Sequence, residues 1–298
     1  MNSLNTYHQY LSRIQGMTQP YNQNEIELQR MKLDTSLVTH RGTKVDMVRH
    51  PAWGAFCFMD DAIQSCEADE RTYHEALVHP AMYNVKKRDR VLIVGGGEGA
   101  TAREVLKWPD VKQVDMYEWD RDVVRLFQTA YPQWAKGAWL DSRLTLYYED
   151  IFDAIKHPPS PSERYDVVII DLFDPEEETI MQWYTLLMNL PQWVHPESTI
   201  VMYAGVNEPG LHPQPYQPYQ RLKGILEYYD EWQDIKAKLV PLNSAITPYR
   251  VFIPSFMGDS TFLLLTPPTA TTIEFDNSVV MKSCHITNDV WAKYTKMD

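Results

Sequence analysis

Five short apolar runs divide the middle of the chain, and each is followed by a polar stretch long enough for a helix or a loop. Strands that helices cover on both faces read as continuous apolar runs rather than as alternating ones. The pattern therefore predicts an α/β fold with a mostly parallel sheet. Its expected strands are residues 91–95, 114–118, 144–148, 166–171 and 199–204.

The pattern changes near the end of the chain. Two β-rich runs, residues 248–254 and 260–266, are joined by the short segment Ser-Phe-Met-Gly-Asp. Strand-like runs this close together are typical of an antiparallel hairpin. We expect this C-terminal antiparallel hairpin to close the parallel sheet.

The front of the chain has a third pattern, in which short strand-like runs are broken by Arg-Gly, Pro and Asp-Asp turn signals. These runs predict a small antiparallel β-domain and cover residues 36–39, 43–49 and 56–59. Residues 1–35 are polar and partly helical in pattern, and residues 67–80 predict a helix. We therefore expect two domains. Residues 1–82 would hold the N-terminal segment, the small β-domain and the linking helix, and residues 83–298 a Rossmann-like catalytic domain.

A glycine-rich turn, Gly-Gly-Gly-Glu-Gly at residues 95–99, lies between the first parallel strand and a helix. Gly95 and Gly97 allow the backbone to turn sharply and to approach a ligand closely. Glu118 ends the next strand about twenty residues later, where a carboxylate can accept hydrogen bonds from both ribose hydroxyls. The arrangement predicts a nucleoside cofactor; the alternative is a tight packing turn.

Glu98 inside this turn distinguishes between nucleosides. A carboxylate there repels the pyrophosphate of a dinucleotide but attracts a sulfonium or an amine. Glu98 therefore favours S-adenosylmethionine or its decarboxylated form over NAD. The alternative is a solvated glutamate that stabilises the helix dipole.

Further acids follow the later strands, at the sheet edge where open α/β folds bind ligands. Asp150 can accept from an adenine amino group or can cap the next helix. Asp171 directly follows a buried strand, and Asp174 lies three residues on, ahead of a proline. Such a pair can hold an amine between two carboxylates and take its proton, so Asp171 is the predicted catalytic base.

The amino-acid composition restricts the kinds of partner that we expect this protein to bind. The 298 residues carry a formal net charge of −12. This disfavours nucleic acid and anionic membranes and suits a cationic substrate. The three cysteines lack metal-ligand spacing, so we expect neither a metal nor a disulfide framework. Without a secretory signal or an apolar run of membrane length, the expected location is the cytoplasm.

Four separate motifs in this sequence resemble the polyamine aminopropyltransferases, the family of spermidine, spermine and thermospermine synthases. The resemblance extends from about residue 50 to residue 266. The Gly-Gly-Gly-Glu-Gly turn and Ile-Pro-Ser-Phe at residues 253–256 are closest to thermospermine synthase-like members. The other two motifs are Asp-Asp-Ala-Ile-Gln-Ser-Cys-Glu-Ala-Asp-Glu-Arg-Thr-Tyr-His-Glu at residues 60–75 and Asp-Leu-Phe-Asp-Pro at residues 171–175.

The resemblance implies a small β-domain before a methyltransferase-like Rossmann domain, usually in a homodimer. It implies decarboxylated S-adenosylmethionine as co-substrate, a polyamine as acceptor and no prosthetic group. Glu98 and Asp171 would hold the aminopropyl amine of the donor, Glu118 its ribose and Asp150 its adenine. The remaining implied residues are Gln64 and His74 for the donor pocket, and Tyr73, Asp174 and Phe256 for the acceptor channel.

Three departures from the family pattern lie around the two substrates. Residues 176–178 are Glu-Glu-Glu where the family commonly has Gly-Pro, Tyr203 stands where a Gln is common, and Thr43 or Lys44 stands nearest to an expected donor-contacting Gln. We expect spermidine as acceptor, because the acidic triplet can bind a third ammonium group; the triplet can also be a solvated helix turn.

Other functions stay open at this point. The chain can be a putrescine-using spermidine synthase. It can also transfer methyl or aminocarboxypropyl from intact S-adenosylmethionine, if Arg103 or Lys44 binds the extra carboxylate. A nicotinamide dehydrogenase is disfavoured by Glu98 and by the lack of a plausible hydride site. A non-catalytic binding module is disfavoured because it would have no use for the Asp171/Asp174 pair.

Overall fold

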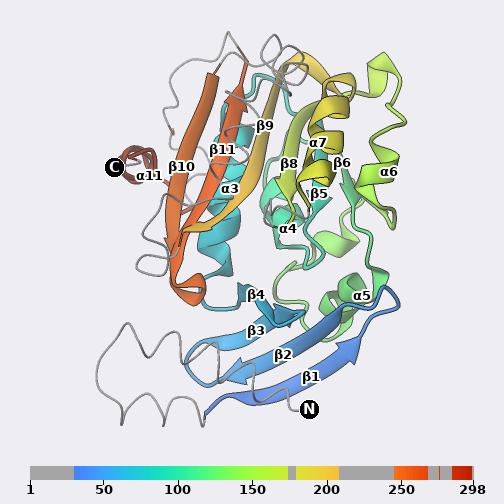
Figure 1. Ribbon diagram of the computed structural model, residues 1–298. Helices are drawn as coiled ribbons and strands as arrows, with labels where there is room; N and C mark the ends of the chain where they lie inside the picture. Colours follow the sequence, from blue (N-terminus) through green and yellow to red (C-terminus); the bar gives the residue numbers. More distant parts are fainter. Residues whose placement is uncertain (1–29, 174–178, 208–244, 268–274, 276–283, 297–298) are drawn as a thin grey trace. The chain divides into compact units, whose positions relative to one another are not determined.

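The computed structural model describes residues 30–173, 179–207, 245–267, 275 and 284–296 (Figure 1). The chain divides into two compact units. The first contains the residues up to Arg71 together with Pro254–Met257, and the second contains Thr72–Ile253 and the residues from Gly258 on. The domain limits expected from the sequence, with a boundary after residue 82, stay a prediction.

The first unit contains a four-stranded antiparallel sheet with strand order β1-β2-β3-β4. Its first strand begins earlier than expected, inside the segment for which the sequence predicts a polar and partly helical character. The strands are β1 (Lys32–Val38), β2 (Lys44–His50), β3 (Gly54–Met59) and β4 (Ala62–Cys66).

Strand β4 differs from the expectation, in which the Asp-Asp pair ends the last strand of this domain. Asp60 and Asp61 have φ values of 45° and 71°, in the left-handed region. Two such residues form the tight hairpin turn whose twist matches the flanking strands. Met59 pairs with Ala62 directly across this turn. The Asp-Asp pair therefore forms a hairpin turn within the small sheet and does not mark its end.

The second unit is built on a seven-stranded sheet with the order β10-β11-β9-β8-β5-β6-β7 (Figure 1). Strands β9, β8, β5, β6 and β7 are parallel, and β11 runs antiparallel to both β9 and β10. This confirms the predicted fold class, including the C-terminal hairpin. The strands are β5 (Arg90–Gly95), β6 (Gln113–Tyr117), β7 (Leu144–Tyr147), β8 (Tyr165–Asp171), β9 (Val194–Asn207), β10 (Ala245–Ile253) and β11 (Gly258–Thr266).

The helix expected at residues 67–80 begins at Glu70, because β4 and a following turn use the residues before it. Among the described residues, no helix has the length and apolar character needed to span a membrane. The α-helices are α3 (Glu70–Tyr83), α4 (Ala100–Leu106), α5 (Arg121–Thr129), α6 (Ile151–Ala154), α7 (Ile180–Asn189) and α11 (Asn288–Tyr294). Short 3-10 turns occur at Ala138–Leu140, Pro161–Glu163, Leu190–Gln192 and Pro254–Phe256.

Side chains along the strands of the large sheet point alternately to its two faces, and both faces are covered. One face packs against α6 and α7 in a core that includes Leu92, Ile170, Met202 and Trp183. Because side chains alternate along a strand, the neighbours of these strand residues point to the opposite face. Helix α3 lies against that opposite face, where Tyr249 of β10 donates a 2.7 Å hydrogen bond to the carbonyl of Ala76. The candidate site lies on this second face.

Candidate active site

A row of residues crosses the second face of the large sheet near the carboxyl ends of the parallel strands. Gly95 pairs with Asp171 across β5 and β8, and Tyr203 pairs with Phe262 across β9 and β11. Ile170 pairs with Met202, so Asp171 and Tyr203 are the next residues along their two strands. The register therefore places an acid, a glycine and two aromatic residues in one line across the sheet.

Asp171, the predicted base, accepts hydrogen bonds from hydroxyl groups at both carboxylate oxygens. The Tyr73 hydroxyl donates to Oδ1 at 2.9 Å, and the Thr101 hydroxyl donates to Oδ2 at 2.6 Å. Tyr73 comes from helix α3 and Thr101 from helix α4. Hydrogen bonds to an ionised carboxylate are stronger than those between neutral groups. Two helices and one strand thus define the position of this carboxylate.

Tyr73 is buried among aromatic rings at the same row. Its ring meets Tyr203 edge-on at 5.7 Å and lies 5.4 Å from the ring of Phe262. Burial, together with the negative charge of Asp171, raises the pKa of Tyr73 well above its usual value. The phenol therefore keeps its proton at neutral pH and acts as a hydrogen-bond donor.

Glu98 is paired with His74, the neighbour of Tyr73 on helix α3. Nε2 of His74 lies 2.7 Å from Oε1 of Glu98, and both side chains are buried. The alternative interpretation of Glu98, a solvated first-turn glutamate, is therefore wrong. The Glu98 carboxylate is thus held by His74 of helix α3. The same helix carries Tyr73, which donates a hydrogen bond to Asp171.

The glycine turn lies very close to two of the acids, whereas its predicted close approach to a ligand stays a prediction. Gly95 has a φ of 81°, and a side-chain carbon there would lie 2.1 Å from the backbone oxygen of Asp171. At Gly97 such a carbon would lie 2.9 Å from Oε2 of Glu118. Any larger residue would displace one of the two acids. These glycines therefore set the spacing between the turn and the carboxylates.

Glu118 is buried beside the turn and accepts a 2.9 Å hydrogen bond from the backbone N–H of Asp120. Burial raises the pKa of Glu118 to about 7, although the backbone hydrogen bonds from Asp120 and Gly97 act in the opposite direction. A buried carboxylate that is costly to ionise gains most from a ligand that donates hydrogen bonds. A ribose diol is such a ligand.

Asp150 caps helix α6, where its carboxylate accepts a 2.9 Å hydrogen bond from the N–H of Phe152. This is the structural alternative raised by the sequence. The cap uses Oδ1 of the carboxylate and fixes the side chain at the end of β7. The adenine role of Asp150 stays a prediction.

Three predicted site residues lie elsewhere or outside the described part of the chain. Gln64 on β4 and Phe256 in the Pro254–Phe256 turn belong to the first unit. In that unit Asp69 accepts hydrogen bonds of 2.7 and 2.8 Å from the backbone N–H and the hydroxyl of Ser255, which fixes the residue before Phe256. Asp174 lies outside the described residues, as does the acidic triplet at 176–178.

Sequence reasoning missed Thr101 and gave Tyr203 no contact role. Thr101 lies two residues after the glycine turn on a helix, where a hydroxyl carries no periodic signal. Tyr203 was noted only as a departure from the family pattern, and Phe262 only as part of the expected hairpin. Tyr203 and Phe262 can be identified from the strand register, which brings residues far apart in the sequence into one row.

Two solved structures share this fold. The spermidine synthase from Thermotoga maritima has a TM-score of 0.70 at 20% identity, over 90% of this chain and 86% of its own. A spermidine synthase in complex with the transition state analogue AdoDATO has a TM-score of 0.63 at 18% identity, over 89% of each chain. The likeness shows an α/β, Rossmann-like architecture with a small antiparallel sheet.

Sequence relatives give the family. Residues 70–209 match the spermine/spermidine synthase domain. A polyamine aminopropyltransferase from Pyrobaculum calidifontis is 36% identical over 215 residues, which cover 71% of this chain and 68% of the relative. The chain therefore belongs to the polyamine aminopropyltransferase family and is an enzyme, a transferase of aminopropyl groups.

Proposed function

We propose that this enzyme moves an aminopropyl group from decarboxylated S-adenosylmethionine to a polyamine and releases methylthioadenosine. One observation carries the proposal: the Asp171 carboxylate, fixed by Tyr73 and Thr101, lies beside the glycine turn. Its Oδ2 is 3.5 Å from the position that a side-chain carbon on Gly96 would take. A proton acceptor thus borders the predicted nucleoside site.

The donor would be held by the acids that surround the turn. Glu98 and Asp171 would bind its aminopropyl ammonium, Glu118 its ribose and Asp150 its adenine. His74 supports Glu98 through their 2.7 Å contact, and Gln64 is the remaining residue that we propose for donor binding. A spermidine synthase of the same fold binds the transition state analogue AdoDATO, which supports this class of co-substrate.

The chemistry follows from the charges. An aliphatic amine is protonated at neutral pH, since its pKa is about 10, and an ammonium is no nucleophile. Asp171 would take a proton from the acceptor amine. The amine nitrogen would then form a bond to the carbon beside the sulfonium, and that carbon–sulfur bond would break with its electron pair remaining on sulfur. A neutral thioether leaves, so no acid is required on that side.

Most of the rate enhancement would come from alignment of the two reactants. Holding a nucleophile and an electrophile in the reacting geometry supplies several kcal/mol of the barrier, about 7–11 in well-oriented cases. The fixed Asp171 adds general base catalysis. A reaction that proceeds in this way would need neither a metal nor a prosthetic group.

For the acceptor we propose spermidine, with thermospermine or spermine as product. Tyr73, Asp174 and Phe256 would line its channel, and the Glu-Glu-Glu segment at 176–178 would bind the third ammonium. Each partly exposed ion pair contributes about 1 kcal/mol or less. The buried ring of Tyr203 beside Tyr73 supports a channel that accepts apolar methylene segments between charges.

The alternative with intact S-adenosylmethionine needs a cation for the extra carboxylate, and the two candidates are engaged elsewhere. Arg103 donates to Glu104 and to the carbonyl of Trp134. Lys44 lies 2.7 Å from Asp46 and 3.1 Å from Asp61 in the first unit. These contacts favour the decarboxylated donor.

Two measurements test the proposal on the purified enzyme. Calorimetry with both sulfonium donors should show tighter binding of the decarboxylated one; tighter binding of intact S-adenosylmethionine would favour the methyl or aminocarboxypropyl alternative. Steady-state rates with putrescine, spermidine and spermine should give the highest kcat/KM for spermidine. A clear preference for putrescine would instead identify a spermidine synthase. The homodimer stays a prediction from the resemblance, and the cytoplasmic location stays a prediction from the sequence.

A further inference from the structure

The second hydroxyl group that donates to Asp171 belongs to Thr101, a residue that was not predicted from the sequence. Thr101 donates to Oδ2 at 2.6 Å from a fully buried position in the first turns of helix α4. From this geometry we infer that Thr101 is a positioning residue for the catalytic base. The inference rests on the proposed function, because it assigns Thr101 to the step in which Asp171 accepts a proton.

The two donors divide the carboxylate between them. Tyr73 binds Oδ1 and Thr101 binds Oδ2, so rotation of the carboxylate breaks both bonds. With Tyr73 alone, the carboxylate can swing about the remaining bond. The productive geometry for proton transfer requires hydrogen-bond distance between the base and the amine. The hydrogen bond from Thr101 therefore fixes the orientation of the Asp171 carboxylate.

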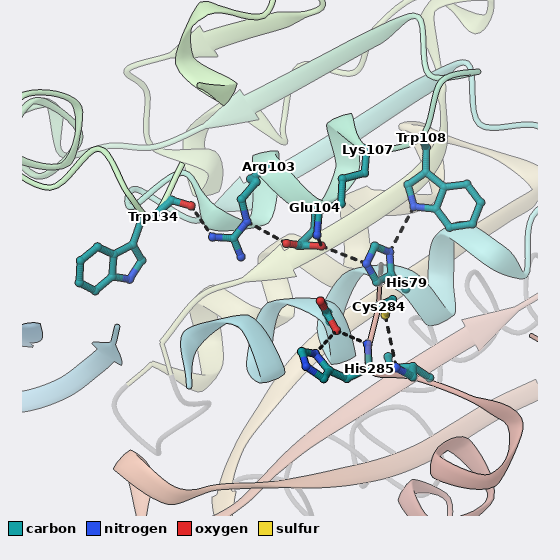
Figure 2. Close-up of polar contacts among 10 residues, drawn as sticks. His79, Arg103, Glu104, Lys107, Trp108, Trp134, Cys284 and His285 are labelled. Atoms are coloured by element: carbon teal, nitrogen blue, oxygen red, sulfur yellow. Dashed lines mark hydrogen bonds and ion pairs between the residues drawn. The ribbon is translucent and has the colours of Figure 1, made fainter. Parts of the chain in front are cut away.

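Helix α4, which carries Thr101, also takes part in a buried network. Glu104, three residues later, lies on the same side of the helix. Its Oε2 is 3.0 Å from Nε2 of His79 on helix α3, and its Oε1 accepts a 2.8 Å hydrogen bond from Arg103 (Figure 2). This network thus joins α4 to α3, the helix that carries Tyr73.

The direction of the hydrogen bonds in this network is fixed. The indole N–H of Trp108 donates to Nδ1 of His79 at 3.2 Å, so the proton of the neutral ring lies on Nε2 and points to Glu104 (Figure 2). Each member has its partner, and the network is a rigid connection between the two helices. It explains how two hydroxyls from separate helices meet one carboxylate.

The hydroxyl of Thr101 would keep its own proton throughout the reaction. It donates to Oδ2 before and after Asp171 receives the proton of the amine, and it forms no bond to either substrate. Because Glu98 would still bind the donor ammonium, loss of this hydroxyl should fall mainly on kcat and only slightly on the affinity for the nucleoside donor. Loss of a hydrogen bond to a charged group corresponds to a rate loss of about 10- to 100-fold.

The test compares two substitutions at this position. Thr101→Val keeps the shape and removes the hydroxyl, and Thr101→Ser keeps the hydroxyl. The matched control is Tyr165→Phe, which removes a buried 2.8 Å hydroxyl-to-carboxylate bond to Asp115 at the opposite end of β8. For each, kcat, the KM for decarboxylated S-adenosylmethionine and the melting temperature are measured beside wild type and Asp171→Asn.

We expect Thr101→Val to lose kcat about 10- to 100-fold with the donor KM within about twofold, and Thr101→Ser to recover to within about threefold of wild type. Tyr165→Phe should lower the melting temperature but retain kcat. Wild-type kcat in Thr101→Val, or an equal loss in Thr101→Ser and Tyr165→Phe, overturns the positioning role. An inactive wild type would instead refute the proposed function, which separates the two failures.

Discussion

Tyr73 donates a 2.9 Å hydrogen bond to Asp171 although the two residues are 98 positions apart in the chain. One residue lies in the first turn of the covering helix α3, and the other ends a central strand of the parallel sheet. The bond brings an α3 side chain to the row that also contains Gly95, Tyr203 and Phe262. The site therefore depends on how α3 lies on the sheet as much as on the sheet itself.

Replacement of Asp171 by Asn should abolish turnover and leave the fold intact. The amide has the same shape, but it can neither take a proton nor bind an ammonium. Loss of a general base costs about 10²–10⁴-fold in rate. The measurement is the steady-state rate together with the circular dichroism spectrum, and near-normal activity would remove Asp171 from the mechanism.

Tyr73→Phe should lower kcat about tenfold while it changes stability little. The ring keeps its contacts with Tyr203 and Phe262, and only the bond to Oδ1 of Asp171 is lost. The matched control is Tyr249→Phe, which removes another buried hydroxyl that binds helix α3 through the carbonyl of Ala76. Equal kcat losses in both variants would mean that the effect comes from helix placement alone.

Glu118 should make the unliganded protein less stable as the pH rises. Its pKa is about 7 in the folded protein and 4.5 as a reference value, so between these pH values the folded state binds the proton more tightly. The free energy of unfolding then falls as the pH rises through this interval, by at most about 3 kcal/mol, and the loss is complete above pH 7.

The measurement is urea unfolding of wild type and Glu118→Gln from pH 5 to pH 8. The variant should gain stability relative to wild type across this range. Binding of methylthioadenosine to wild type should also be tighter at pH 8 than at pH 6, since the ionised carboxylate accepts from the ribose hydroxyls. Parallel pH dependences in the two proteins would contradict the assignment of the raised pKa to Glu118.

Glu104→Gln should be strongly destabilising. Burial raises the pKa of Glu104, but the hydrogen bond from His79 and the charges of Arg103 and Lys107 outweigh it and hold the pKa below its usual value. Breaking a buried ion pair costs about 3–5 kcal/mol. A lowered carboxyl pKa contributes stability above pH 4.5, and that contribution is lost as the pH falls further.

Urea unfolding at pH 7 and pH 4 tests this prediction. The difference between wild type and Glu104→Gln should shrink at the lower pH. The exposed Glu149→Gln is the control and should change the free energy of unfolding by less than about 0.5 kcal/mol at either pH. If Glu104→Gln behaves like this control, the network of Figure 2 does not stabilise the fold.

The sequence predicted the large sheet well because its strands are continuous apolar runs. The five parallel strands and the hairpin all lie within a few residues of their expected positions. The acids at the strand ends followed from the same reasoning, since Asp171 directly ends a buried run. Periodic burial is a local property, and a local reading of the sequence suffices for it.

Contacts that depend on helix docking could not be read in this way. Strand β4 was not predicted because an Asp-Asp pair is also typical of the end of a strand. Here Asp60 and Asp61 have a left-handed backbone and form a hairpin turn. The donors to Asp171 come from two helices, and neither hydroxyl carries a periodic signal. The pairing of Glu98 with His74 has the same origin.

The most direct test of the account is the mass of the product. The enzyme is incubated with spermidine and either decarboxylated or intact S-adenosylmethionine, and the products are separated and weighed by mass spectrometry. The account predicts spermidine extended by one aminopropyl group, with methylthioadenosine, from the decarboxylated donor only, and no product with Asp171→Asn. Methylated or aminocarboxypropylated spermidine formed from the intact donor would contradict it.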